Sequence, residues 1–382
     1  MDIIVKYIDE LLEKSTPDAP MWNIEKIRDG GVKSNWNYID GVMIKAVLQM
    51  YDVTKDEKYL KFADDFIDYR VHEDGTIEGY SVGEKNIDNV NAGKTLFELY
   101  DLTGKEKYRK AIDLVYSQIE IMPRCNNEAR SFWHKDIYPN QVWLDGLYMG
   151  LPFYLEYETR YNDRKNYSDI FGQFKFVIEN MRNPINGLYF HAMDTSREAF
   201  WCDKVTGLSQ HSWLRAIGWY TMALIDTLDQ VDNKDHKYDA ECKMLEDAFK
   251  DLVDSMLKYQ DESGMWYQVV NYGGMDKNYL ETSGSSIMAY ALLKAIRLGY
   301  LSDDYAQYAK KAIDGICERY LKTKEDGSLS LGGICLVAGL GGNGRRSGTY
   351  DYYMSEPIVE DDAKGVGPFL LAYTELLRYE NK

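Results

Sequence analysis

The sequence contains a ten-residue stretch that occurs twice, as MYDVTKDEKY at residues 50–59 and as LYDLTGKEKY at residues 99–108. A weaker third copy begins at Glu156-Tyr157. Each copy separates two segments whose apolar residues recur at helical spacing, and a Thr or Asp stands where it can cap the second segment. The repeat therefore predicts a helix, a tight turn and a second helix, recurring about every 50 to 80 residues.

Extending this unit along the chain predicts two kinds of helix. One set is rich in small and apolar residues and begins at about Trp36, Asp88, Trp143, Trp213, Thr282 and Gly365. The other set carries Lys, Asp and Glu on one face and begins at about Asp2, Asp56, Glu106, Asp163, Tyr238 and Asp303. Small residues in the first set permit close packing between helices, namely Gly41, Ala92, Gly93, Gly146 and Gly218.

This alternation predicts an all-α fold, an (α/α)6 barrel in which an inner ring of six helices is surrounded by six outer ones. Residues 1–382 are expected to form this barrel as a single domain. An open helical solenoid is the structural alternative, but its repeats would be more regular in length and would need polar caps at both ends.

The composition narrows the class of protein. With a formal net charge of −17 and no basic runs, the chain lacks the surface that nucleic acid requires. The N-terminus, which begins Met1-Asp2, does not resemble a signal peptide, and no apolar stretch approaches membrane-spanning length. The five cysteines are scattered, without the spacing of a zinc site or a disulfide framework. We therefore expect a cytoplasmic protein, a monomer or weak homodimer, that binds neither nucleic acid nor membranes.

Catalytic candidates follow from the direction of the inner helices. All six run the same way in such a barrel, so the loops before them open at one end. Residues 143–150, WLDGLYMG, place Asp145 beside an indole where a helix begins. Asp88 lies one repeat earlier, so the two carboxyl groups are expected to face one sugar, as the carboxyl pair of a glycosidase does. A helix cap is the alternative interpretation of each aspartate.

Aromatic and basic residues near the same end are candidate sugar ligands. Trp36, Trp143, Trp213 and Trp219 can stack on a pyranose, and Arg215 can bind a uronate carboxylate or form an intrahelical ion pair. His134 and His191 lie in aromatic loops, where a structural hydrogen bond is the alternative to ligand binding. Ligand spacing for a metal is absent, so none is expected.

A glycine-rich motif at residues 339–344, GLGGNG, matches a dinucleotide-binding pattern and follows an apolar run. The residues after it, Arg345 to Tyr350, are expected to continue as a loop, whereas that pattern requires a helix. The motif is therefore not interpreted as a nucleotide site.

Three segments together resemble glycoside hydrolase family 105, the unsaturated rhamnogalacturonyl hydrolases. They are residues 142–153, VWLDGLYMGLPF; residues 209–219, SQHSWLRAIGW; and the C-terminal pair 353–359, YMSEPIV, and 364–369, KGVGPF. The resemblance covers nearly the whole chain and implies the same barrel, without metal or other cofactor. It implies removal of a 4,5-unsaturated galacturonyl residue from the non-reducing end of rhamnogalacturonan-derived oligosaccharides.

The same resemblance implies individual roles. Asp145 protonates C4 of the double bond and then activates water for attack at C5, while Asp88 holds ring hydroxyls. Trp143 and Trp213 form the sides of the site, and His191 and Arg215 contact the unsaturated sugar. The resemblance supports a substrate contact less strongly for His134. Two alternatives remain open: an unsaturated glucuronyl hydrolase of the related family 88 that acts on glycosaminoglycan disaccharides, and a noncatalytic helical toroid that binds oligosaccharides or a protein.

Overall fold

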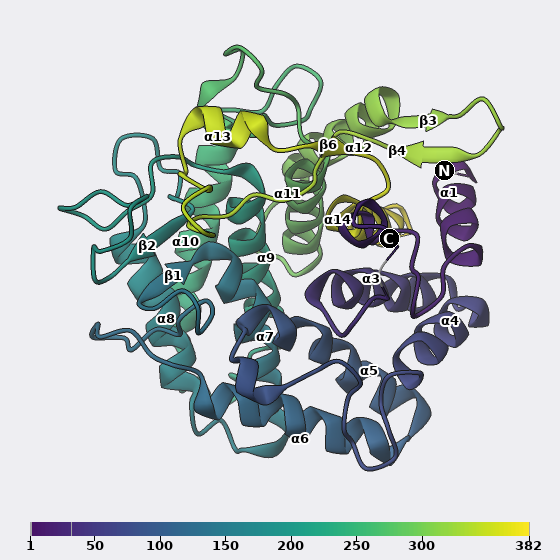
Figure 1. The fold of residues 1–382 in the computed structure, drawn as a ribbon, viewed down its shortest axis with the longest axis horizontal. Coiled ribbons are helices and arrows are strands. Elements are labelled where there is room, and N and C mark those ends of the chain that lie inside the picture. The colour runs from purple at the N-terminus through teal and green to yellow at the C-terminus, as the bar shows by residue number, and fades with distance from the viewer. Residues whose placement is uncertain (1, 32, 382) are drawn as a thin grey trace.

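The computed structural model describes residues 2–31 and 33–381. Met1, Val32 and Lys382, which belong to the expected domain of residues 1–382, lie outside the described residues. Figure 1 shows helices arranged in two concentric rings around a central axis.

The inner ring consists of the less polar helices. They are α3 (Tyr38–Thr54), the 3-10 helix η2 (Ile87–Gly93) continuing into α5 (Lys94–Thr103), α7 (Leu144–Tyr161), α9 (Leu214–Gln230), α11 (Thr282–Arg297) and α14 (Ala363–Glu380). Each packs against the next in this order, and α14 packs against α3. The ring is therefore closed, which confirms the (α/α)6 barrel and excludes the open solenoid.

The outer ring consists of the more polar helices. They are α1 (Asp2–Glu13), α4 (Glu57–Asp68), α6 (Glu106–Ile121), α8 (Tyr167–Asn180), α10 (Asp239–Leu257) and α12 (Ala306–Tyr320). In α4 the residues Tyr59, Ala63, Phe66 and Ile67 are buried, spaced as one face of a helix. Five outer helices pack on the inner helix that precedes them in sequence: α4 on α3, α6 on α5, α8 on α7, α10 on α9 and α12 on α11.

Two predicted helix starts differ from the structure for local reasons. The second inner helix was expected at about Asp88, but a 3-10 helix occupies residues 87–93 and the α-helix begins at Lys94. Asn89, Asn91 and Gly93 are weak helix formers, which accounts for the tighter first turns. The fourth outer helix was expected at about Asp163, whose φ of 47° is left-handed, and it begins at Tyr167.

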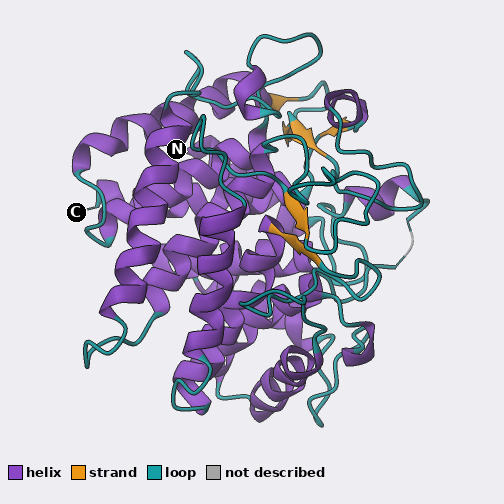
Figure 2. Cartoon of the chain, turned by 90° about the vertical axis from the view of Figure 1, so that its left-hand side faces the viewer, coloured by secondary structure: helices purple, strands orange, loops and turns teal. Residues whose placement is uncertain are grey.

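Short elements gather at one end of the barrel (Figure 2). Three antiparallel strand pairs are β1 (Gln141–Trp143) with β2 (Ala192–Asp194), β3 (Leu321–Thr323) with β4 (Leu329–Leu331), and β5 (Ile334–Cys335) with β6 (Ile358–Val359). The short helices at this end are α2 (Ile24–Arg28), η1 (Val82–Glu84), η3 (Val270–Tyr272) and α13 (Tyr350–Ser355), whereas η4 (Asp303–Tyr305) connects the end of α11 to α12 at the opposite end. The loops before the inner helices belong to the same end as the strand pairs, which we call the mouth.

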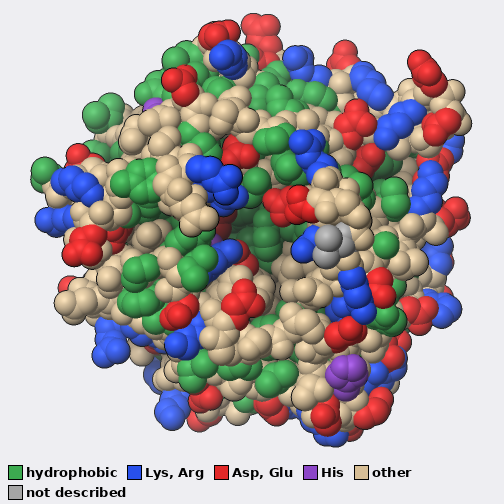
Figure 3. Space-filling view, viewed as in Figure 1, with side chains coloured by type: hydrophobic (Ala, Val, Ile, Leu, Met, Phe, Trp, Pro, Cys, Tyr) green, Lys and Arg blue, Asp and Glu red, His purple; other side chains and the backbone are tan. Residues whose placement is uncertain are grey.

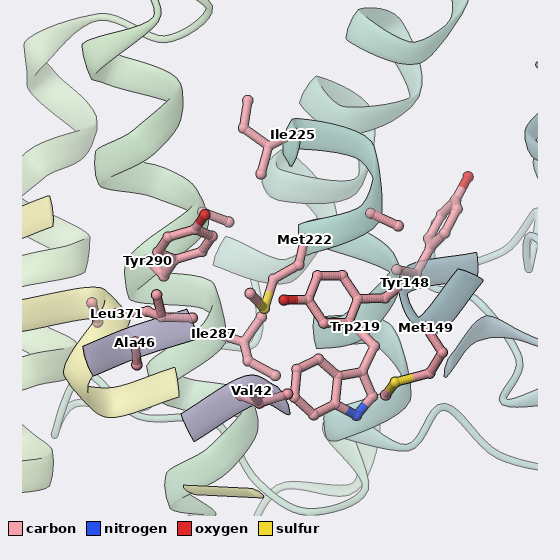
Figure 4. Packing of buried hydrophobic residues seen from close by; sticks show 14 of the residues in the cluster. Val42, Ala46, Tyr148, Met149, Trp219, Met222, Ile225, Ile287, Tyr290 and Leu371 are labelled. Atoms are coloured by element: carbon pink, nitrogen blue, oxygen red, sulfur yellow. The ribbon is translucent and has the colours of Figure 1, made fainter. Parts of the chain in front are cut away.

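Side chains fill the axis of the barrel below the mouth (Figure 4). Residues from several inner helices meet there, among them Val42, Tyr148, Trp219, Ile287 and Leu371, all buried. The Tyr148 and Trp219 rings are stacked with centroids 5.0 Å apart. Side chains therefore fill this part of the barrel, which is a packed core rather than an open channel.

The predicted close packing at small residues is confirmed. A Cβ atom on Gly41 would lie 2.5 Å from the Ala92 Cα atom, and one on Gly218 would lie 3.0 Å from Ile287. Such contacts bring inner helices together at the separation that closes the ring. Among residues 2–31 and 33–381, no helix combines the length and apolar character needed to cross a membrane.

Candidate active site

A cavity of about 240 Å³ opens at the mouth. Trp219 and Met149 connect it to the packed axis, and most of the predicted site residues line it. The lining residues are Glu25, Tyr38, Asp88, His134, Lys135, Tyr138, Trp143, Asp145, Met149, Trp213, Arg215, Trp219, Val337, Ala338 and Arg346. The space-filling view shows the central hollow with charged side chains around it (Figure 3).

Asp145 is the second residue of α7, and its carboxylate faces His191. The His191 Nε2 atom lies 3.4 Å from Asp145 Oδ2, and the side-chain exposure is 0% for the histidine and 14% for the aspartate. On its other side, His191 Nδ1 lies 2.8 Å from the Tyr353 hydroxyl. Burial raises the pKa of Tyr353 well above its ordinary value, so its hydroxyl keeps its proton. The Nε2 side of the ring faces Asp145 Oδ2 at 3.4 Å, although the two atoms make no hydrogen bond within the described residues.

Backbone pairing explains why His191 lies beside Asp145. Strands β1 and β2 are antiparallel, with Trp143 opposite Ala192. The Leu144 N–H donates to the His191 carbonyl at 3.1 Å. The hairpin-like pair therefore fixes the histidine at the start of α7, although the two residues are far apart in sequence.

Asp88 has a different environment, because a lysine binds it directly. Lys135 Nζ lies 2.7 Å from Asp88 Oδ2, and His134 Nε2 lies 3.4 Å from Oδ1. Burial alone would raise the pKa of Asp88, but the charge and hydrogen bond of Lys135, together with His134, hold that pKa below its ordinary value. Burial lowers the pKa of His134 to about 4, so this imidazole is neutral at higher pH. Asp88 is therefore a fixed carboxylate beside a neutral histidine.

Aromatic rings form one wall of the cavity. The Trp143 ring stacks on His134 with centroids 4.6 Å apart and on Tyr138 at 5.2 Å. His191 meets the same indole edge-on at 5.3 Å and lies 4.8 Å from the Trp213 ring. Flat apolar faces beside hydrogen-bonding groups are what a pyranose ring requires.

Arg215 is buried against the same wall and does not form the intrahelical ion pair that was the alternative to ligand binding. Its guanidinium donates to the Cys335 carbonyl at 2.5 Å and to the Ser283 hydroxyl at 3.4 Å, and it lies 4.8 Å from the Trp213 ring. Within the described part of the chain, no carboxylate lies within 4.0 Å of it. A buried cation of this kind is suited to an anionic ligand.

Two of the predicted site residues are absent from the cavity lining. One is His191, which is buried behind it against Asp145, Trp143 and Trp213. The other is Trp36. Its indole N–H donates to the Asn89 carbonyl at 2.9 Å, and its ring lies 6.3 Å from Tyr80. These contacts give it a structural position between α3 and η2. Its proposed contact with substrate stays a prediction, as do the roles of the other site residues.

Several residues that line the cavity, and Tyr353, which is buried behind it and contacts His191, were not predicted from the sequence. Lys135 and Tyr138 follow His134 in a loop. A loop has no residue periodicity, so the sequence did not indicate that these two side chains face the cavity. Arg346 comes after the glycine-rich segment, and Tyr353 stands inside the C-terminal motif. Within the described residues, only the position of Tyr353 in a recognised motif offered a signal that could have identified it.

The fold and the cavity define a helical toroid with carboxylates in an aromatic pocket, the kind of site that carbohydrate-active enzymes use. The model for Glycosyl Hydrolase Family 88 matches residues 16–380. The chain therefore belongs to this family and is a glycoside hydrolase.

Known proteins agree with this assignment. A family 105 glycoside hydrolase of Clostridium acetobutylicum has a similar structure, with a TM-score of 0.86 and 43% identity, covering 95% of this chain and 99% of that one. A protein of Agrobacterium fabrum is 40% identical over 60% of this chain and 98% of its own length. An unsaturated rhamnogalacturonyl hydrolase of Bacillus subtilis is 25% identical over 77% of this chain and 78% of its own. The resemblance to family 105 is confirmed.

Proposed function

We propose that this glycoside hydrolase removes a 4,5-unsaturated galacturonyl residue from the non-reducing end of rhamnogalacturonan-derived oligosaccharides. The observation that carries the proposal is the contrast between the two aspartates of the cavity. Lys135 binds Asp88, whereas the one ion-pair partner of Asp145 among the described residues is His191. Asp88 is thus suited to accept hydrogen bonds from sugar hydroxyls, and Asp145 is free to exchange a proton.

The proposed chemistry is hydration of the C4=C5 double bond. Protonated Asp145 gives its proton to C4, and the positive charge that develops at C5 is shared with the ring oxygen. The Asp145 carboxylate then takes a proton from water as the water oxygen bonds to C5, which restores the acid. The resulting hemiketal opens and releases the neighbouring sugar, so that one water is consumed and no group remains on the enzyme.

Other parts of the cavity support an acidic sugar. The buried Arg215 guanidinium, with no carboxylate of its own within 4.0 Å among the described residues, can neutralise the uronate carboxylate. The Trp143 and Trp213 rings border the same space. The Bacillus subtilis relative is named for this activity, which supports the choice of rhamnogalacturonan over glycosaminoglycan fragments. We further propose that the enzyme acts in the cytoplasm, where buried thiols such as Cys125 and Cys335 stay reduced.

The test is incubation with unsaturated rhamnogalacturonan and glycosaminoglycan disaccharides while the ultraviolet absorbance of the conjugated double bond is followed. We expect loss of absorbance, fastest with the rhamnose-linked compound. Preference for a glycosaminoglycan disaccharide would instead support the glucuronyl hydrolase alternative. Absence of turnover with every compound would leave the noncatalytic toroid.

The variant Asp145→Asn tests the role of the acid. It should lower kcat by about 10³-fold while the dissociation constant for substrate changes little, because the amide keeps the shape but cannot donate the proton. Asp113→Asn, on the exposed face of α6, is the matched control and should retain wild-type kcat. An Asp145→Asn enzyme with normal kcat would contradict the proposed mechanism.

A further inference from the structure

A second cavity of about 480 Å³ adjoins the candidate active site. Its lining residues are Tyr138, Gly342, Asn343, Arg345, Arg346, Tyr352, Ser355 and Glu356. Tyr138 and Arg346 line both cavities, so the two spaces meet along these side chains. A ligand longer than one sugar can therefore extend from the first cavity into the second.

The glycine-rich segment at residues 339–344 forms the rim of this second cavity. The Gly341 N–H donates to the Arg346 carbonyl at 2.9 Å, and the Arg346 N–H donates to the Gly341 carbonyl at 3.0 Å. The backbone is left-handed at Gly341, Gly342 and Gly344, with φ of 84°, 57° and 78°. Glycine adopts this conformation without steric cost, so the motif makes a tight hairpin rather than a nucleotide site. The hairpin places Arg345 and Arg346 side by side at the rim.

The charge of the second cavity is opposite to that of the chain as a whole. The chain has a net charge of −17, yet two arginines and a single carboxylate, Glu356, line this space. Among the described residues, neither Arg345 nor Arg346 has a carboxylate within 4.0 Å. Burial raises the pKa of Glu356, although Tyr352 and the charge of Arg346 act in the opposite direction. Two unpaired guanidinium groups favour a carboxylate ligand over a neutral sugar.

Tyr138 supplies a surface between the two cavities. One contact of its ring is the stacked Trp143 indole at 5.2 Å, and the side chain is only partly buried. A partly exposed phenol ring is a suitable surface for a sugar that carries no charge. The order along the cleft is thus an acidic-sugar cavity, an aromatic surface and a pair of arginines.

We propose that the second cavity, which we call the arginine subsite, binds a uronate carboxylate in the leaving group, two rings beyond the unsaturated sugar. This inference rests on the proposed function, because the unsaturated end must occupy the first cavity. Rhamnogalacturonan alternates galacturonate and rhamnose, so the uncharged rhamnose would lie at Tyr138 and the next galacturonate at Arg345 and Arg346. The preferred substrate is then an oligosaccharide with a second uronate rather than the disaccharide.

The experiment compares kcat/KM for the unsaturated disaccharide and for the tetrasaccharide with the same linkages. We expect wild-type enzyme to prefer the tetrasaccharide by about three- to tenfold at low salt, the range of one well-placed exposed charge pair. Methyl esterification of the internal uronate should abolish the preference. Arg345→Gln should lower the tetrasaccharide-to-disaccharide ratio to about one and make it insensitive to esterification. Arg319→Gln, which removes an equal charge from the outer helix α12, should keep the wild-type ratio.

A binding measurement separates failure of this inference from failure of the proposed function. In the Asp145→Asn background, titration calorimetry should show tighter binding of the tetrasaccharide than of its methyl ester, and Arg345→Gln should remove the difference. If binding shows that difference but wild-type enzyme turns over neither compound, the arginine subsite stands and the proposed function fails. Equal affinity for the acid and the ester, with or without turnover, would overturn the subsite.

Discussion

At the scale of single residues, two aspartates with similar local sequence have different surroundings. Both lie in the first turn of a helix, but Lys135 contacts Asp88 at 2.7 Å, and a histidine contacts Asp145. The partner of each comes from a separate loop. The proposed division into a binding carboxylate and a proton donor therefore depends on neighbours that helix position alone does not specify.

The Tyr353 hydroxyl is expected to position His191, which in turn faces Asp145. Tyr353→Phe removes the oxygen 2.8 Å from His191 Nδ1 and so removes the hydrogen bond that orients the imidazole. We expect kcat to fall by about tenfold with little change in KM. Tyr305→Phe is the comparison, since it removes a hydroxyl that bonds Asp254, and Tyr305 lines neither cavity. Equal effects of both variants on kcat would show that no specific positioning exists.

Acid sensitivity is expected from His134. Its pKa is about 4 in the folded protein and 6.5 ordinarily, so between these values the unfolded chain binds a proton that the folded protein does not. Stability is thus fully present above pH 6.5 and declines as the pH falls towards 4. The lowered pKa of Asp88 adds a further loss of stability at lower pH. The pKa of Asp40 is raised to about 6, so Asp40 instead favours the folded state as the pH falls.

Unfolding in urea at pH 7.5 and pH 5 measures this contribution. In His134→Gln the loss of unfolding free energy between the two pH values should be smaller than in wild type by about 2 kcal/mol at most. His236→Gln, at a histidine with 80% side-chain exposure, should show the wild-type loss. An unchanged pH dependence in His134→Gln would contradict the assignment.

At the scale of elements, glycines on the inner helices set how closely neighbours approach. A Cβ atom on Gly41 of α3 would lie 2.5 Å from the Ala92 Cα atom in η2, which is backbone and cannot rotate away. Around a Cβ atom on Gly172 of the outer helix α8, no atom of the described residues lies within 4 Å. Two glycines in helices therefore have opposite packing environments.

The matched pair Gly41→Ala and Gly172→Ala tests this difference. Gly41→Ala should destabilise the protein by about 1–3 kcal/mol, because α3 and η2 must separate. Gly172→Ala should stabilise it by about 0.5–1 kcal/mol, because alanine has the higher helix propensity and meets no neighbour. Thermal unfolding of both variants measures the effects. A stabilising Gly41→Ala would show that the two helices are not in close contact.

At the scale of the whole molecule, the first and last inner helices close the ring. Helix α14 packs on both α11 and α3, so nearly the entire chain separates two elements in direct contact. One hydrophobic core extends from Ile4 to Leu376. A closed core of this kind loses cooperativity when one element is removed, whereas an open repeat array shortens without losing it.

Deletion of residues 363–381 tests ring closure. The shortened chain should lack the cooperative thermal transition of the full protein, because α3 and α11 would each expose an apolar face. A chain that ends after Arg378 keeps nearly all of α14 and should melt close to wild type. Circular dichroism during heating distinguishes the outcomes. A cooperative transition in the chain without α14 would indicate that the remaining hairpins are stable alone.

Residue patterns within single segments of the sequence were sufficient to predict much of the fold. The repeat at residues 50–59 and 99–108 and the spacing of apolar residues predicted the order and polarity of twelve helices, because helix formation depends on neighbours three and four residues away. The fourth outer helix was placed four residues early, at Asp163 rather than Tyr167, and the second inner helix, expected at Asp88, begins as a 3-10 helix, because left-handed residues and 3-10 turns give no periodic signal. The segment around Asp145, together with residues 209–219 and the C-terminal pair 353–359 and 364–369, indicated the family.

Tertiary structure alone decided which side chains share the cavity. His191 and Tyr353 are 162 residues apart, and the hydrogen bond between them exists because ring closure brings α13 to the loop before α9. Trp36 had the sequence context of its inner-helix counterparts, yet its indole is bound to the Asn89 carbonyl outside the lining. Arg346 lines the cavity from the hairpin that Gly341 and Arg346 close. In the sequence this segment was compared only with a nucleotide-binding motif, so Arg346 was not predicted as a site residue. The sequence by itself determined the helices and their polarity, which are local properties, whereas contacts at the mouth depend on the closure of the complete ring.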